Sequence, residues 1–176
     1  MEADHFAASL LMPRLLFMDA MRTAGDGLRA FEKLADRCGT SLTATAIRYA
    51  QCTRDPLAVV LSTGGRINYC FMSDALKEVK DLDWIRKGEG LSRGTATFSF
   101  NQDAECVLRS ERVEDSSDLR DWFGGEQSIE ITEEVIGLGS YGQTLTVLTA
   151  LDIDEQIEEI EEEEDLDESW TPRFRR

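Results

Sequence analysis

The sequence contains a single histidine, His5, among its 176 residues. Because imidazole is the commonest general base and metal ligand among side chains, one histidine limits the catalytic and zinc sites that the chain can build alone. No apolar run reaches the roughly 18 residues of a membrane-spanning helix, so no membrane partner is expected. Glu2 and Asp4 stand where a secretory signal carries basic side chains, and we therefore expect a cytoplasmic protein.

Cysteines are few and widely separated, and they include no C-x-x-C pair; the four are Cys38, Cys52, Cys70 and Cys106. This spacing argues against a zinc ribbon and against a disulfide framework, so we expect small, buried apolar residues. A Ser–His or Cys–His catalytic pair would depend on His5 at the very start of the sequence. No catalytic residue is therefore assigned from the sequence.

Basic residues are outnumbered, since 19 Lys and Arg accompany 35 Asp and Glu and give a formal net charge of −16. The residues after Ala150 carry 12 acidic and 3 basic side chains, which leaves a net charge of −7 for residues 1–150. An acidic body repels nucleic acid, and duplex DNA is not expected as the main partner. The acidic run at 161–165 predicts a disordered tail over residues 152–176, with a short amphipathic helix as the alternative.

Apolar residues recur at three- and four-residue steps through residues 1–54, which predicts a helical region. Pro13 separates the first predicted helix from the second. A third helix is predicted over Leu28–Arg37 and a fourth from Leu42 to about Cys52, with Gly39 as the stop between them. The inward side chains predicted for the third helix are Leu28, Phe31, Leu34 and Ala35.

Turn residues and period-two patterns dominate residues 55–151, which predicts a small, mainly antiparallel β-sheet domain. Gly64-Gly65 marks one hairpin, and Ser140-Tyr141-Gly142 joins the strands of a closing hairpin. The segments "TATFSF" at 95–100 and, more loosely, "ECVLRSERVE" at 105–114 are also expected to be strands. The prediction is therefore an α+β fold, with helices first, the sheet second and the acidic tail last.

Two adjacent glutamates, Glu133 and Glu134, lie on a predicted strand of the closing hairpin. Successive side chains of a strand point to opposite faces, so these carboxylates cannot work together as an acid–base pair. We expect them to be charges on the surface of the sheet.

The opening segment "EADHFAASLLMP" places Glu2 and His5 one helical turn apart, on one face of the first predicted helix. A carboxylate beside an imidazole can bind a metal, but a zinc ion needs three or four protein donors. From chemistry alone, Glu2 is better explained as an N-terminal helix carboxylate favoured by the helix dipole.

The same segment resembles the E-A-N/D-x-F-A-A-x-L-L-M-P stretch that follows the zinc-binding helix in the ImmA/IrrE family of metallopeptidases. These bacterial and phage proteins cleave DNA-binding repressors. In the family, an upstream H-E-x-x-H helix supplies two zinc ligands and the general base, and a later glutamate completes the zinc site. The resemblance makes Glu2 the candidate for that later ligand, whereas His5 falls at a variable position and receives no role.

Two further segments are similar to the same family. Residues 28–50 resemble its helix-turn-helix-like stretch. Residues 56–73 and 129–149 look like the β-rich C-terminal domain of longer members, which in some resembles a GAF sensor fold. The resemblance thus implies a helix-turn-helix-like region within residues 1–54 and a sensor-like domain over residues 55–151.

The family's H-E-x-x-H motif is absent from these 176 residues. Three hypotheses for the function are compatible with this absence. In the first, the chain is a truncated or N-terminally incomplete metallo-endopeptidase. It would bind no catalytic zinc alone and would be inactive unless another protein supplied the H-E-x-x-H half. Its partners would be that half or a repressor-type substrate.

The second hypothesis is a non-catalytic regulatory module, in which the β domain senses a small ligand and the helical pair binds a protein or DNA. The face that would contact DNA offers Thr43, Thr45, Arg48 and Gln51. The third is a partner protein, similar to an antitoxin, whose acidic tail occupies a basic surface. The sequence alone leaves these alternatives open.

Overall fold

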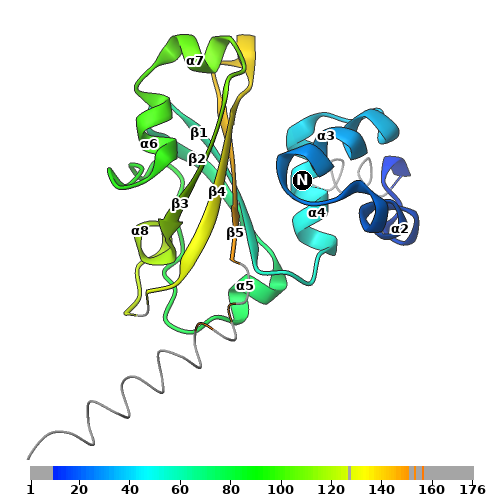
Figure 1. Ribbon diagram of the computed structural model, residues 1–176, viewed down its shortest axis with the longest axis horizontal. Coiled ribbons are helices and arrows are strands. Elements are labelled where there is room, and N and C mark those ends of the chain that lie inside the picture. The colour runs from blue at the N-terminus through cyan, green and yellow to red at the C-terminus, as the bar shows by residue number, and fades with distance from the viewer. Residues whose placement is uncertain (1–9, 127, 151–152, 154–155, 157–176) are drawn as a thin grey trace, which may run out of the picture.

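A computed structural model describes residues 10–126, 128–150, 153 and 156, and it confirms the predicted α+β fold (Figure 1). Helices come first in the chain: α2 (Arg14–Ala24), α3 (Gly27–Cys38) and α4 (Leu42–Cys52). The strands are β1 (Leu57–Thr63), β2 (Arg66–Met72), β3 (Arg112–Asp118), β4 (Glu130–Gly137) and β5 (Thr144–Thr149). Short helices lie between the strands: α5 (Asp74–Glu78), α6 (Ala96–Asn101), α7 (Ala104–Leu108), α8 (Leu119–Phe123) and the 3-10 turn η1 (Gly139–Tyr141).

Local capping explains the positions of α3 and α4. Gly39 adopts the left-handed conformation after α3, with φ 64° and ψ 38°, and its N–H binds the carbonyl of Ala35. The Ser41 side chain then accepts a hydrogen bond from the Ala44 N–H at the start of α4. Both helices match their predicted ranges to within a residue, and the four inward residues predicted for α3 are buried.

All five strands form one antiparallel sheet in the order β2-β1-β5-β4-β3. Gly64 and Gly65 connect β1 to β2 with φ of 55° and 78°, as a tight hairpin turn with two left-handed residues requires. The turn η1 and Gly142 connect β4 to β5. Both predicted hairpins are confirmed.

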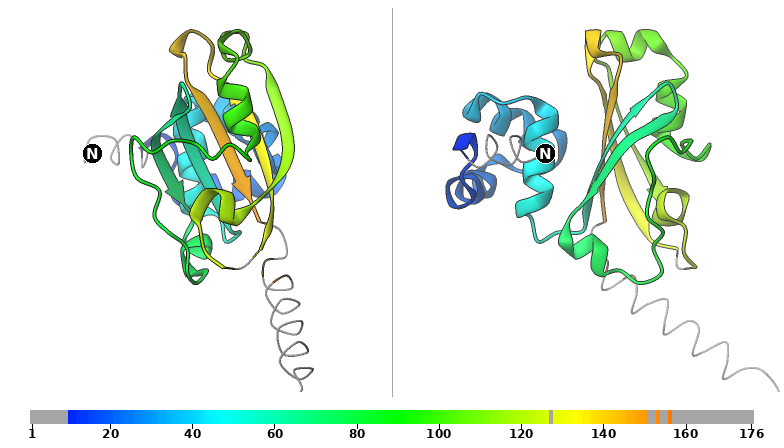
Figure 2. Two further views of the ribbon diagram at one scale, coloured as in Figure 1. Left: turned by 90° about the vertical axis from the view of Figure 1, so that its left-hand side faces the viewer. Right: turned by 180° about the vertical axis from the view of Figure 1, so that it is seen from behind.

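The sheet is the middle of three layers (Figures 1 and 2). One face packs against α3 and α4, which α2 covers from the far side, and here Val59 and Val147 join the core around Phe31. The other face lies against the short helices, where Val60 and Leu148 join a second core. Central strands covered on both faces need apolar residues at every position, which explains the unbroken apolar run of β1. The helical layer and the sheet share a core, and their division into separate domains at residue 54 stays a prediction.

The strand predicted at residues 95–100 is wrong, because this segment forms helix α6. The Thr95 side chain accepts a hydrogen bond from the Phe98 N–H, and Glu133 accepts those of Ala96 and Thr97. These partners satisfy the first amides of the helix, so tertiary contacts override the alternating pattern. The second predicted strand divides at Ser110, with φ 55°, into helix α7 and strand β3.

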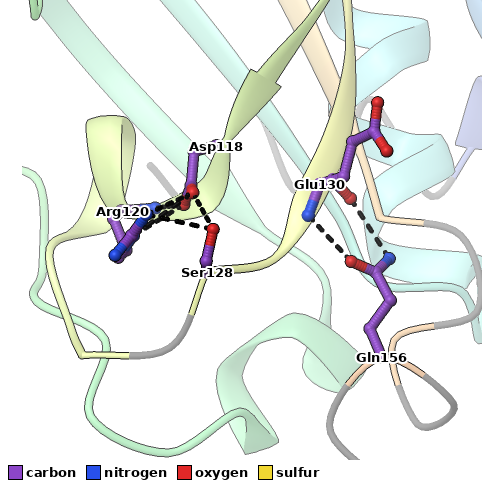
Figure 3. A network of polar contacts seen from close by, with 5 residues as sticks. All are labelled: Asp118, Arg120, Ser128, Glu130 and Gln156. Atoms are coloured by element: carbon purple, nitrogen blue, oxygen red, sulfur yellow. Dashed lines mark hydrogen bonds and ion pairs between the residues drawn. The ribbon is translucent and has the colours of Figure 1, made fainter. Parts of the chain in front are cut away.

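Beyond β5, the described residues Ile153 and Gln156 contact the sheet. The Gln156 side chain accepts a hydrogen bond from the Glu130 N–H at 2.8 Å and donates one to the Glu130 carbonyl at 3.3 Å (Figure 3). Nearby, Asp118 binds Arg120 and Ser128 and so closes the loop between β3 and β4. The other residues of the predicted acidic tail lie outside the described part of the chain.

No helix formed by the described residues has both the length and the apolar composition that crossing a bilayer requires. All four cysteines are free thiols; Cys52 is buried and the other three are half-buried, so the expected burial is confirmed only in part. Burial raises the pKa of the Cys70 thiol to about 12, and hydrogen bonds to Glu111 and Asp103 raise the pKa of Cys106 to about 11. These two thiols stay protonated near neutral pH, which makes them poor nucleophiles.

Candidate functional site

Glu133 and Glu134 point to opposite faces of β4, as predicted, but neither is a simple surface charge. Glu133 is fully buried against α6, and Glu134 is half-buried against the start of α3. Each carboxylate accepts hydrogen bonds from the first amides of a helix, one on each side of the sheet. The prediction of surface charges is therefore wrong, because a helix packs over each side chain.

The Glu133 carboxylate belongs to a closed polar cluster between the sheet and α6. It accepts hydrogen bonds from the Thr97 N–H at 2.6 Å, from the Ala96 N–H at 3.2 Å and from the Thr97 hydroxyl. The Thr97 hydroxyl lies 2.7 Å from that of Thr146, and Asn101 bridges β1 and β5 through Ser62 and the Thr144 hydroxyl. Since its members satisfy one another, this cluster is a structural feature of the core.

On the opposite face, Glu134 fixes α3 to the sheet. The Leu28 N–H donates to both carboxylate oxygens, at 3.0 and 3.2 Å. The carboxylate occupies the space where a side chain at position 27 would begin, since a Cβ there would lie 2.6 Å from Cδ of Glu134. Gly27 also has φ 67°. This contact therefore requires glycine at position 27 on two grounds.

A cavity of about 330 Å³ lies next to this contact, between the helical layer and strands β1, β4 and β5. Four carboxylates line it: Asp26, Asp55, Glu114 and Glu134. The remaining lining residues are Gly27, Tyr49, Leu57, Thr132 and Thr149, so no basic side chain from the described part of the chain contributes to the wall. We refer to this space as the junction cavity.

Tyr49 places a polar group without a partner in this acidic setting. Its side chain is only 6% exposed, and its ring packs on Phe31 with 4.7 Å between the centroids. Among the described residues, nothing forms a hydrogen bond with its hydroxyl, and this oxygen is not one of the buried polar atoms without a partner, so it reaches solvent. Burial raises the pKa of Tyr49, and repulsion by Asp26 and Asp55 raises it further. Tyr49 also lines an adjoining cavity of about 490 Å³ toward α2.

Glu134 itself titrates abnormally. Burial raises its pKa above the ordinary 4.5, the Leu28 N–H opposes that shift, and Glu114 adds to it by repulsion. Arg112 and Arg29 also lower its pKa, but less strongly than the Leu28 N–H does. Arg112 is already paired with Glu32. The cavity wall therefore holds negative charge that the described part of the protein compensates poorly.

A larger groove of about 610 Å³ opens on the same side of the sheet, near η1. It contains the ion-paired Arg112 and Glu32, together with Ser41, Leu138 and Tyr141. Its charged groups compensate each other, and Tyr141 is 81% exposed. The junction cavity is the better candidate site, because its carboxylates form no ion pair among the described residues.

The residues predicted to contact DNA do not form a free surface on α4. Thr45 is fully buried and bonds to Thr40 and to the Ser41 carbonyl. Arg48 donates to the Met12 carbonyl at 2.8 and 3.0 Å, and to Gln51 at 3.2 Å. The prediction that these side chains form an exposed face is therefore wrong, because Thr45 is buried and Arg48 is bonded to the Met12 carbonyl.

The zinc ligand implied by the family resemblance, Glu2, lies outside the described residues, as does His5. Within the described ranges, no three His, Cys, Asp or Glu side chains come together closely enough to hold a metal ion. That this chain binds no catalytic zinc by itself therefore stays a prediction from its single histidine. Comparison with known proteins gives no assignment either, since no family model and no curated protein matches the chain.

Proposed function

We propose that the chain is the non-catalytic, regulatory module of a cytoplasmic ImmA/IrrE-type protein, and that it binds a small ligand in the junction cavity. The resemblances at residues 2–13, 28–50 and 129–149 support the family. The order of the elements, helices before an antiparallel sheet, agrees with that proposal. The observation that carries the binding function is the junction cavity, whose wall is formed by both the helical layer and the sheet.

The size and position of the junction cavity suit a regulatory ligand. Small-molecule sites begin at roughly 300 Å³, so about 330 Å³ accommodates a compact metabolite. Its wall combines the start of α3, the end of α4 and strand β4. A ligand bound there contacts the helical layer and the sheet at once, and it stabilises the arrangement in which the two are docked.

A cavity-filling substitution tests this function. Thr132→Phe places a ring in the junction cavity on a strand position that tolerates aromatics. Thr63→Phe, at the exposed end of β1, is the matched control. In a thermal-unfolding screen of cationic, neutral and anionic metabolites, we expect at least one compound to raise the Tm of the wild type and of Thr63→Phe by about 3 °C or more, but not that of Thr132→Phe. A screen in which no compound discriminates the two variants contradicts the proposal.

A second candidate function is the incomplete metallo-endopeptidase, completed by another protein that carries H-E-x-x-H. The observation that favours it is a set of exposed leucines within the resembling motif and directly after it: Leu10, Leu11, Leu15 and Leu16, each at least 53% exposed. Coexpression with an H-E-x-x-H domain would then yield a complex that contains one zinc and cleaves a repressor in a chelator-sensitive manner. Hydrolysis by this chain alone would contradict both candidate functions.

A further inference from the structure

We infer that the C-terminal segment of this chain, residues 157–176, binds four exposed leucines at the start of α2 and covers them. The four leucines, which we call the leucine patch, are Leu10, Leu11, Leu15 and Leu16. The segment itself lies outside the described residues. This inference goes beyond the proposed ligand site, because it concerns a different surface and does not depend on the junction cavity.

The leucine patch is highly exposed for a set of large apolar side chains. Leu15 is 80% exposed, Leu10 and Leu16 are each 69% exposed, and Leu11 is 53% exposed. All four fall within residues 10–16, in the first turn of α2 and in the residues before Pro13. Covering apolar surface lowers the free energy, and exposed apolar side chains that gather in one place mark a binding surface. We therefore expect the leucine patch to have an occupant.

The charge of the helical layer selects an acidic occupant. Residues 10–55 carry 7 basic and 5 acidic side chains, a net charge of +2, whereas residues 56–150 carry 9 basic and 16 acidic ones, a net charge of −7. At the patch, Arg14 is exposed and forms no ion pair with a described residue, while Arg22 is paired with Asp19. Arg14 therefore leaves an uncompensated positive charge beside the leucines.

Residues 157–176 combine negative charge with apolar side chains. They carry 9 acidic and 3 basic side chains, a net charge of −6. Five large apolar residues are spread along the same segment: Ile157, Ile160, Leu166, Trp170 and Phe174. These apolar side chains complement the leucine patch, and the carboxylates complement Arg14 and the positive helical layer. A second copy of the chain fits less well, because two chains of net charge −16 repel each other.

The described chain leaves the sheet on the side where the helical layer joins it. The Met12 carbonyl, inside the patch sequence, accepts hydrogen bonds from Arg48 on α4. α4 continues into β1, whose first residue, Leu57, pairs with Thr149 at the end of β5. The leucine patch and the exit of the chain from β5 are therefore both connected to the segment between α4 and β1 (Figure 1).

The segment is long enough to reach the patch. Gln156 binds the Glu130 backbone at the start of β4. The 20 residues after Gln156 span up to roughly 65 Å when extended, whereas a body of about 150 residues is only roughly 40 Å across. Binding within one chain therefore requires no change in the described fold. A partner that uses the leucine patch, as the second candidate function requires, would have to displace this segment.

The experiment maps amide chemical shifts by NMR in the full chain, and a synthetic peptide of residues 157–176 gives the shifts of the unbound segment. The test variant combines Leu15→Ser with Leu16→Ser, two side chains outside the core. The matched control is Leu108→Ser, on a leucine of α7 that is 54% exposed and lies in the other helical layer. We expect docking of the segment to weaken about tenfold or more in the double variant, so that its amide shifts approach those of the peptide. The control should keep the wild-type shifts.

A reciprocal variant, Ile160→Ser with Trp170→Ser, leaves every described residue unchanged and should move the amide shifts of residues 10–16. The inference is overturned if the segment already matches the free peptide in the wild type, or if the double leucine variant leaves its shifts unchanged. Shifts that grow with protein concentration would identify a second copy as the occupant and would also overturn it, because binding within one chain does not depend on concentration.

Discussion

At the scale of single residues, two adjacent glutamates of β4 have separate structural roles. Glu133 satisfies the start of α6 from inside the core, whereas Glu134 binds the start of α3 beside the junction cavity. The strand period predicts that they face opposite sides, but it does not reveal which helices cover them. Both partners are distant in sequence, 36 and 106 residues away, so sequence pattern alone could not identify these contacts.

Removal of the Glu133 carboxylate should destabilise the protein. Glu133→Ala leaves two helix amides and the Thr97 hydroxyl without their acceptor and opens a cavity in the core. We expect a loss of about 3 kcal/mol in the free energy of unfolding, measured by urea denaturation. Glu130→Ala, an exposed side chain on the same strand, is the control and should cost about 0.5 kcal/mol or less. Equal losses of stability in Glu133→Ala and Glu130→Ala would show that the buried Glu133 cluster contributes no more than an exposed glutamate does.

The raised pKa of Glu134 predicts a pH dependence. In the range above 4.5, the folded state binds this proton more tightly than the unfolded state, so the contribution of Glu134 to stability falls as the pH rises. Glu134→Gln keeps an acceptor for the Leu28 N–H and removes the titration. The free energy of unfolding of Glu134→Gln minus that of the wild type should therefore increase from pH 4.5 to 7. If this difference in the free energy of unfolding stays constant or decreases with pH, the raised pKa of Glu134 is contradicted.

At the scale of secondary-structure elements, local signals predicted α3, α4 and both hairpins, because caps and glycine turns are encoded within a few residues. The same local reasoning failed at α6. Its alternating sequence favours a strand, but a buried carboxylate from β4 satisfies the helix amides. The junction cavity was not predicted either, since Asp26, Tyr49 and Glu134 come from three elements that only the tertiary fold brings together.

The docking of α3 on β4 can be tested at Gly27. Gly27→Ala introduces a Cβ that displaces the Glu134 carboxylate, and the left-handed strain together with the lost Leu28 hydrogen bond should cost about 2 kcal/mol in the free energy of unfolding. Gly39→Ala is a close control, because its φ is 64° but a Cβ there meets no atom within 4 Å. Its cost should be only the left-handed strain, about 1 kcal/mol. In a double-mutant cycle, Glu134→Ala should recover part of the Gly27→Ala loss, and strict additivity would contradict the clash.

At the scale of the whole molecule, the sheet lies between two helical layers (Figure 2). The junction cavity is lined by residues of the sheet and of one of these layers. The opposite side of the sheet holds the closed Glu133 cluster, whose polar groups satisfy one another. Ligand binding on the helical-layer side therefore requires no disruption of that core. It would act on the docking between α3, α4 and the sheet, which is the contact a regulatory module needs to change.

The most direct test of this account is amide chemical-shift mapping by NMR of the whole chain, titrated with each compound that raises its Tm. Ligand binding in the junction cavity predicts saturable shifts that cluster at Leu28, Tyr49, Leu57, Thr132 and Thr149, and that disappear in Thr132→Phe. Shifts confined to other surfaces, or shifts that persist unchanged in Thr132→Phe, would contradict it.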